Sequence, residues 1–363
     1  MQTIKAAVCR EFGAPLSIED IQIAAPGMGQ VEVTLEAVAI CHSDIHYAEG
    51  GWGGNLPAVY GHEASGAISA IGQGAGDFKV GDRVIVTLIR ACGSCPNCAG
   101  GKPTICSTPI DGQKGPIRTS DGAPLEQAMA CGAFAERVVV DHSQIVKIPS
   151  DMAGDVACLL SCGVITGVGA AVNAANLRPG QDAVVIGAGG VGLNAIQGAR
   201  IAGARRVVAV DMTEEKLETA KEFGATHGVL ATDKTPWKSV FKALGGKGAD
   251  VVMVTVGAIP AFDQAPRYLA LGGKVIIVGL PHAGDTAQYE PMIIGALSQG
   301  MIGSKMGDVV IQRDIPWMID LYKQGRLKLD ELISGRWSLG QINEAIADTN
   351  SGSAKRNVIV FDR

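Results

Sequence analysis

The fold is decided by one glycine-rich stretch, Gly187-Ala188-Gly189-Gly190-Val191-Gly192. It follows a short apolar run at residues 183–186 and precedes a helical pattern at 193–202. In such a strand–turn–helix unit, Gly187 permits the tight turn, Gly189 lets the backbone approach a pyrophosphate, and Gly192 lets helix and strand pack closely. The free N–H groups at the start of the helix also favour phosphate. We therefore predict that this loop, Gly190 and Val191 included, binds a dinucleotide.

The next predicted strand, residues 207–210, supports this interpretation. It is followed directly by Asp211, at the distance from Gly192 that is typical of dinucleotide-binding units. A carboxylate at this point accepts hydrogen bonds from the adenosine ribose hydroxyls and repels a 2′-phosphate, which favours NAD over NADP. The alternative is a doubly wound domain that binds no nucleotide.

Strands and helices alternate from about residue 179 onward. We expect strands at 183–186, 207–210, 251–256 and 274–278, and helices at 193–202, 214–223 and 261–269. This alternation specifies a parallel sheet covered by helices, so the fold class is α/β.

The first third of the chain is β-rich by the same criteria. Short apolar or alternating runs occur at 4–9, 31–40, 67–71, 83–89 and 136–140. After about residue 302 the chain supplies a helix (315–324), a polar stretch and a last strand (357–361), a tail too short to fold alone. We therefore expect one domain from 1–163 and 302–363, and a second from 164–301.

Composition narrows the function classes. The 363 residues suit two domains, and a net charge of -5 gives no basic face for nucleic acid. The stretch from Met1 to Gly13 shows no secretory signal, so we expect a cytoplasmic protein. The segment between Asp155 and Arg178 carries no charge and is long enough to span a bilayer. Glycine, serine, threonine and asparagine interrupt this segment, so we interpret it as buried structure and expect no membrane partner.

Four of the nine cysteines form one compact cluster, Cys92, Cys95, Cys98 and Cys106. Without an export signal disulfides are disfavoured, and four thiolates so close in sequence complete a tetrahedron around a structural zinc ion. An iron–sulfur cluster and a redox-sensing cluster are the competing interpretations.

A second constellation is dispersed along the chain. Cys41, His62 and Cys162 would supply two thiolates and one imidazole, leaving a fourth position open for water or a substrate oxygen. Spacing alone does not join these residues, and an isolated His62 is more often structural.

The motifs occur together in an order that resembles one family. They are Cys41-His42-Ser43-Asp44, Gly61-His62-Glu63, Val80-Gly81-Asp82-Arg83-Val84, the four-cysteine cluster, Cys162-Gly163 and the stretch from Gly187 to Gly192. Over essentially its whole length the chain resembles the zinc-dependent medium-chain alcohol dehydrogenases. The resemblance implies a GroES-like β-rich catalytic domain and a Rossmann NAD-binding domain. It also implies two zinc ions per chain, one catalytic and one structural.

The resemblance also assigns the residues around the catalytic zinc. Cys41, His62 and Cys162 are its implied ligands, and Glu63 lies just behind the metal, able to exchange onto it. Asp44 is the implied carboxylate that orients His62.

The implied reaction is hydride transfer between an alcohol and NAD, giving an aldehyde or ketone. Zinc would lower the proton affinity of the alcohol oxygen. Ser43 would take the alcohol proton and pass it, through the nicotinamide ribose, to His46. Taken alone, Ser43 is typical of a helix cap and His46 of a solvated loop.

Cofactor contacts follow from the same resemblance. Lys216 is expected at the adenosine ribose, and Arg356 and His42 at the pyrophosphate. His42 departs from relatives that carry arginine, and a neutral imidazole would hold pyrophosphate less firmly. Thr166 and the segment Val278-Gly279-Leu280 are expected to flank the nicotinamide.

The substrate is less well specified. Trp52 and Leu88 match positions that line the alcohol pocket, which suggests an apolar substrate tail. Glutathione-dependent formaldehyde dehydrogenases are close in overall pattern, but Gly50, Trp52 and Ile110 stand where charged groups would hold a thiol adduct. The loop at 114–118 could supply positive charge to another acidic alcohol.

Two further expectations concern assembly and catalysis. The resemblance implies a homo-oligomer, because edge strands of the coenzyme-binding sheet commonly pair in this family. The segment between Cys106 and Gly132 is longer than the loop of the tetrameric members, which favours a dimer. A zinc- and nucleotide-binding protein without turnover is the remote alternative.

Overall fold

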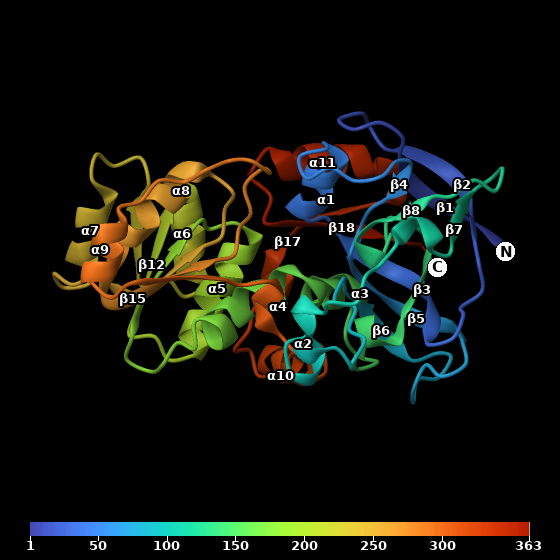
Figure 1. Cartoon of the computed structure of the whole chain (residues 1–363), viewed down its shortest axis with the longest axis horizontal. Coiled ribbons are helices and arrows are strands. Elements are labelled where there is room, and N and C mark those ends of the chain that lie inside the picture. The colour runs from blue at the N-terminus through green and yellow to red at the C-terminus, as the bar shows by residue number, and fades with distance from the viewer. Residues whose placement is uncertain (363) are drawn as a thin grey trace. The chain divides into compact units, whose positions relative to one another are not determined.

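The computed structural model describes residues 1–362 and divides the chain into two compact units (Figure 1). The first unit comprises 1–162, 310–322 and 328–363, and the second comprises 163–309 and 323–327. Gly163 and residues 302–309 and 323–327, expected in the first domain, group with the second unit. The reason for residues 302–309 is that strand β16 (Gly300–Gly303) pairs with β15 in the sheet of the second unit, and the turn that follows β16 stays with that sheet.

A six-stranded parallel sheet forms the centre of the second unit. Its strands are β11 (Asp182–Ile186), β12 (Arg206–Asp211), β13 (His227–Leu230), β14 (Ala249–Val254), β15 (Leu269–Ile277) and β16 (Gly300–Gly303). They lie in the order β13-β12-β11-β14-β15-β16, the arrangement of dinucleotide-binding domains. The strand order reverses between β11 and β14, and such folds bind ligands beyond the carboxyl ends of the strands at this point.

Helices flank this sheet in the green-to-orange part of Figure 1. They are α4 (Gly163–Gly169), α5 (Gly190–Ile201), α6 (Glu214–Glu222), α7 (Pro236–Ala243), α8 (Ile259–Gln264) and α9 (Pro291–Ala296). Helices α4 and α5 touch backbone to backbone: a Cβ on Gly167 would lie 2.4 Å from the Val191 oxygen, and one on Gly198 2.8 Å from the Val168 Cα.

Two sheets build the first unit. One contains β1 (Gln2–Cys9), β2 (Ser17–Ile23), β4 (Ala58–Val59), β7 (Ile117–Thr119) and β8 (Glu126–Gln127). The other contains β3 (Gln30–Ala39), β5 (Glu63–Ile71), β6 (Arg83–Val86), β9 (Arg137–Asp141), β10 (Ile145–Lys147), β17 (Ile333–Trp337) and β18 (Arg356–Val360). The last strand returns to this unit, where β18 pairs antiparallel with β3.

The helices of the first unit are α1 (His42–Ala48), α2 (Pro96–Ala99), α3 (Gly154–Ala157), α10 (Ile311–Lys323) and α11 (Ile342–Asn350). The region expected to be a polar stretch holds the strand β17 and the helix α11. Only Ile342, Ala345 and Thr349 of α11 are buried. The amide of Asn357, itself fully buried, donates to Ala345 O, Asp348 Oδ2 and Thr349 Oγ1, which ties the helix to β18.

Within residues 1–362, no single helix is both long enough and apolar enough to cross a membrane. Two short helical segments, Gly154–Ser161 and Gly163–Ala174, reach the required length only when counted together across a bend. All seven residues of α4 are buried.

Candidate metal and nucleotide sites

Four side chains that are dispersed along the sequence lie close together in the first unit. The ligand atoms of Cys41, His62, Glu63 and Cys162 all lie within 4.8 Å of one another, and all four residues are buried. Cys41 directly precedes α1, Glu63 begins β5, and Cys162 follows a short 3-10 helix, Cys158–Ser161. Three distant segments therefore bring together the residues that spacing alone could not join.

His62 is oriented for metal binding. Its ring is fully buried, and Nδ1 donates to Asp44 Oδ1 at 3.0 Å. Because Nδ1 carries the proton, Nε2 offers its lone pair, and it has no hydrogen-bond partner among the described residues. Burial opposes the charged ring, but Asp44 and Cys41 outweigh it and raise the pKa of His62. A buried nitrogen without a partner beside two sulfurs fits a metal ligand.

Asp44 organises the site from behind. Besides the His62 ring, its carboxylate accepts from the backbone N–H of Cys41 at 3.2 Å and of Gly61 at 2.9 Å. One buried carboxylate therefore fixes the ring of His62 and the backbone of Cys41, both candidate metal ligands.

Asp44→Asn is expected to weaken zinc binding about 10- to 100-fold, because an amide has one acceptor oxygen for three N–H donors. Competition with a chromogenic chelator measures this affinity. Asp82→Asn, which changes a surface carboxylate paired with Lys147 at 2.7 Å, serves as the control. Equal zinc affinity in the two variants would contradict the role given to Asp44.

The two thiols of the site are in contact with each other. A hydrogen bond from Cys162 lowers the pKa of Cys41, and the same contact raises the pKa of Cys162. Tetrahedral zinc with bonds of about 2.0–2.3 Å separates its ligand atoms by roughly 3.3–3.8 Å, within the observed limit. The donor set and its spacing fit zinc.

Glu63 lies against a buried arginine. Arg356 is 5% exposed, and its Nη1 lies 3.2 Å from Glu63 Oε1 and donates to the Ile40 oxygen at 3.3 Å. Burial raises the pKa of Glu63 to about 8, and Arg356 limits this rise. The sequence pattern did not predict this contact, because Arg356 lies near the far end of the chain from Glu63. The pyrophosphate contact expected of Arg356 stays a prediction.

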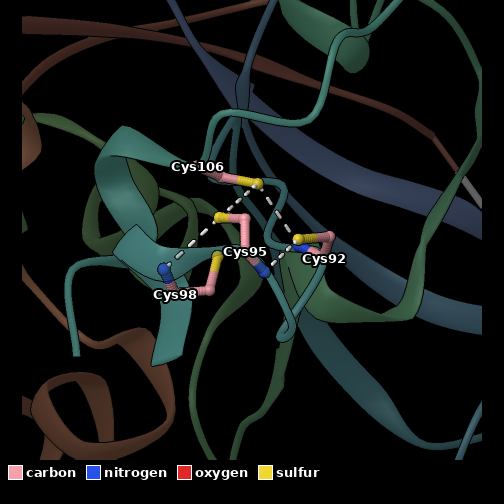
Figure 2. A group of neighbouring side chains, drawn as sticks. All are labelled: Cys92, Cys95, Cys98 and Cys106. Carbon is pink, nitrogen blue, oxygen red and sulfur yellow. Dashed lines mark hydrogen bonds between the residues drawn. The ribbon is translucent and has the colours of Figure 1, made fainter. Parts of the chain in front are cut away.

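The cysteine cluster forms a second candidate metal centre (Figure 2). Backbone N–H groups donate to its sulfurs: Cys95 N to Cys92 at 3.2 Å, Cys98 N to Cys95 at 3.4 Å, and Cys92 N to Cys106 at 3.4 Å. Hydrogen bonds, led by that of Thr108, lower the pKa of Cys92 to about 5, and the N–H of Cys98 leads in lowering that of Cys95 to about 7. These donors favour the thiolate form of Cys92 and Cys95, the form that binds zinc, whereas burial raises the pKa of Cys98 to about 12.

The predicted relay residues lie on one helix. Ser43 and His46 are three positions apart on α1 and share a face, and both are half-buried. The His46 ring lies 5.2 Å from that of Trp52, which meets Tyr47 edge-on at 5.1 Å. The helix begins at His42, which is exposed.

The predicted pocket residue Leu88 follows β6 in the same unit. It is half-buried and packs against the apolar core that includes Val86.

The glycine loop of the second unit has the geometry its sequence predicts. Gly187 adopts a φ of +96°, and a Cβ on Gly192 would lie 1.8 Å from the Gly187 oxygen, whereas one on Gly189 would meet nothing within 4 Å. Asp211 Oδ2 accepts from the N–H of Ala188 at 2.6 Å, which holds the carboxylate beside the loop.

A threonine missed in the sequence fastens this loop to the next strand. The Thr255 hydroxyl lies 2.9 Å from the Ile186 oxygen and 3.0 Å from the Gly187 oxygen, as a donor to both. A polar residue directly after the apolar strand β14 was the available signal.

The remaining cofactor candidates also lie in the second unit. Lys216 is half-buried in the first turn of α6. Thr166 is buried inside α4 rather than capping it, and its hydroxyl donates to Met306 Sδ at 3.7 Å. The segment Val278-Gly279-Leu280 follows β15, and a Cβ on Gly279 would lie 2.5 Å from Val256.

Comparisons with known proteins agree with this geometry. The family model for the alcohol dehydrogenase GroES-like domain matches residues 27–150, and that for zinc-binding dehydrogenases matches 190–324. Alcohol dehydrogenase B of Mycobacterium tuberculosis is 35% identical over 370 residues, and the NDMA-dependent alcohol dehydrogenase of Amycolatopsis methanolica is 35% identical over 365. Each match covers 98% of both chains. The crystal structure of benzyl alcohol dehydrogenase from Acinetobacter calcoaceticus superposes with a TM-score of 0.93 at 30% identity, covering 100% of both chains.

Proposed function

Because the chain belongs to the zinc-dependent medium-chain alcohol dehydrogenases, we propose that it transfers hydride between an alcohol and NAD, giving an aldehyde or ketone. The proposal rests on one cluster of buried side chains, Cys41, His62, Glu63 and Cys162. In this cluster His62 Nε2 has no hydrogen-bond partner among the described residues. The first unit acts as the catalytic domain and the second as the nucleotide-binding domain.

Two zinc ions complete the protein. Cys41, His62 and Cys162 hold the catalytic ion, and the four-cysteine cluster holds the structural one. When bound, the catalytic ion acts as a Lewis acid that polarises the alcohol or carbonyl oxygen.

The surrounding residues orient the reactants and move the proton. Asp44 fixes the tautomer of His62. Ser43 would take up the alcohol proton while its hydroxyl releases its own proton toward His46, which lies on the same helix. Trp52 and Leu88 line the substrate side and favour an apolar tail.

NAD binds beyond the carboxyl ends of the parallel strands. Gly187, Gly189, Gly190, Val191 and Gly192 cradle the pyrophosphate, with His42 and Arg356 as further contacts. Asp211 and Lys216 bind the adenosine ribose, and Thr166 and the segment from Val278 to Leu280 flank the nicotinamide.

Asp211→Asn is expected to lower kcat/KM for NAD about tenfold and to raise it for NADP, because the amide neither attracts ribose hydroxyls as strongly nor repels a 2′-phosphate. The variant keeps an oxygen to accept the Ala188 N–H, which lies 2.6 Å from the native carboxylate. Steady-state kinetics with both cofactors measures the ratio, with the exposed Asp233→Asn as control. An unchanged ratio would remove Asp211 from the ribose site.

An apolar or aromatic alcohol suits the site better than an acidic one. In the loop that could have bound an anion, Lys114 pairs with Asp111 at 3.1 Å. Arg118 Nη1 donates to its own loop at Gly115 O and Ile117 O, each at 2.6 Å. The superposed benzyl alcohol dehydrogenase is consistent with an aromatic substrate.

An NAD-reduction screen across short, long, aromatic and acidic alcohols tests the proposal, together with zinc quantification. We expect turnover of an apolar or aromatic alcohol and two zinc ions per chain. Activity that appears only with formaldehyde plus glutathione would favour a thiol-adduct substrate instead. Absence of turnover with both metals bound would favour a non-catalytic protein. We further propose a homodimer that works in the cytoplasm.

A further inference from the structure

The segment that follows helix α1 carries a single side chain. Within residues 50–54 every position is glycine except Trp52. Three of the four glycines adopt φ values of 79°, 70° and 135°, a region that favours glycine, and the N–H of Gly51 donates to the oxygen of His46 at 2.9 Å. The glycines therefore turn the chain back onto α1 and place the indole of Trp52 against this helix.

The indole lies against the ring of His46. The centroids of the two rings are 5.2 Å apart and their planes are tilted by 33°, within the range at which ring pairs attract each other. Both side chains are half-buried, and the indole covers part of the imidazole. His46 lies three positions after Ser43 on α1, so the indole contacts the residue at the end of the proposed proton relay.

Trp52 is itself held by a ladder of aromatic rings. It meets Tyr47 edge-on at 5.1 Å, and Tyr47 stacks on Tyr60 at 6.2 Å. Tyr60 is 2% exposed, and its hydroxyl donates to the backbone oxygen of Tyr47 at 3.3 Å. Because Tyr60 stands two residues before His62, the ladder runs from a buried ring beside a candidate metal ligand to His46.

A histidine that is held in one orientation suits proton transfer. A general base must lie within hydrogen-bond reach of the proton that it accepts, about 2.6–3.2 Å between heavy atoms. An unrestrained side chain visits other rotamers, and ordering it costs free energy. A ring packed against His46 in the folded protein orders the imidazole before any alcohol binds.

We propose that Trp52 is a positioning residue for His46. Its indole holds the imidazole in the orientation in which it accepts the proton that the Ser43 hydroxyl releases. This inference rests on the proposed oxidation of an alcohol. It differs from a contact between Trp52 and a substrate tail, because it acts through His46 and is therefore the same for every alcohol.

Nuclear magnetic resonance of the ligand-free protein tests the contact without turnover. The ring current of an indole shifts the resonances of protons that lie against it. The protein has six histidines, and the signal that is lost in His46→Gln identifies the imidazole of His46. We expect these resonances to move toward those of a solvated histidine in Trp52→Leu, and to move less in Trp52→Phe, which keeps an aromatic ring. Unchanged resonances in Trp52→Leu would overturn the proposal.

Steady-state kinetics of alcohol oxidation tests the function of the contact. We expect Trp52→Leu to lower kcat/KM about tenfold, near the upper range for one aromatic pair, and Trp52→Phe to lower it no more than about twofold. The loss should be equal for a short alcohol and an aromatic alcohol. In the His46→Gln background, Trp52→Leu should cause no further loss, because two residues that act through one contact are not additive.

Trp237→Leu is the matched control. Trp237 is another half-buried tryptophan with an edge-on ring partner, Phe241 at 6.1 Å, but it lies on α7 of the second unit, and its variant should keep wild-type kcat/KM. Both Trp52 variants should keep two zinc ions and wild-type NADH affinity, and loss of either would show a structural role instead.

Three kinetic results would also overturn the proposal. They are a loss in Trp52→Leu that is confined to the aromatic alcohol, an equal loss in the wild-type and His46→Gln backgrounds, and wild-type turnover in His46→Gln. If the wild-type protein oxidises no alcohol, the proposed function fails instead.

Discussion

Replacement of Cys41 by serine is expected to lower kcat/KM at least about a thousandfold, with loss of one zinc ion per chain. The catalytic ion supplies several kcal/mol of charge stabilisation, and each step of about 1.4 kcal/mol corresponds to a factor of about ten in rate. A serine hydroxyl is a far weaker zinc ligand than a thiolate. In the variant only His62, Glu63 and Cys162 would remain as strong ligands for the ion.

Three measurements define this result: turnover, zinc content and NADH affinity. The second zinc ion and NADH affinity should persist, because the cysteine cluster and the glycine loop do not depend on Cys41. Cys9→Ser is the matched control, because Cys9 is a buried cysteine like Cys41. The Cys9 thiol donates a hydrogen bond to the backbone oxygen of Glu11, and a serine hydroxyl can make the same bond. A Cys41→Ser protein that keeps both metal ions and near-normal turnover would refute the catalytic assignment.

In the glycine loop at residues 187–192, replacing Gly192 or Gly189 by alanine should weaken NADH binding in both cases, but for different reasons. In Gly192→Ala the new methyl would lie 1.8 Å from the Gly187 oxygen, so the backbone must move. We expect destabilisation by about 3 kcal/mol, a fall of roughly 6–12 °C in melting temperature, and NADH affinity reduced at least about a hundredfold.

Gly189→Ala is the matched comparison. Nothing lies within 4 Å of the added methyl, so the ligand-free melting temperature should not change. NADH should nevertheless bind more weakly, because the methyl occupies the place where pyrophosphate approaches the backbone. Calorimetry and NADH titration separate the two effects. An equal fall in melting temperature for both variants would contradict this view of the loop.

Much of the fold followed from local patterns. The second unit alternates buried strands such as β11 with amphipathic helices such as α6, and the predicted parallel sheet is confirmed. Helix α11 was missed because only Ile342, Ala345 and Thr349 are buried and polar residues stand between them. Its position depends on the amide of Asn357, a tertiary contact that no local pattern reveals.

The candidate sites could likewise be predicted only where their residues are close together in the sequence. The cysteine cluster could be predicted because its ligands are local in sequence. The dispersed ligands were joined only through the family resemblance, and the structure brings them together. The Arg356–Glu63 contact depends on which distant segments of the chain lie next to each other. The sequence therefore does not distinguish these two residues from other arginines and glutamates in the chain.

The pairing of β18 with β3 has a consequence for synthesis on the ribosome. All six strands of the second unit's sheet lie within residues 163–309, so they are translated before β18. The larger sheet of the first unit stays incomplete, and the Arg356–Glu63 contact cannot form, until β18 has been translated. The larger sheet of the first unit therefore closes only after every strand of the second unit's sheet has been made.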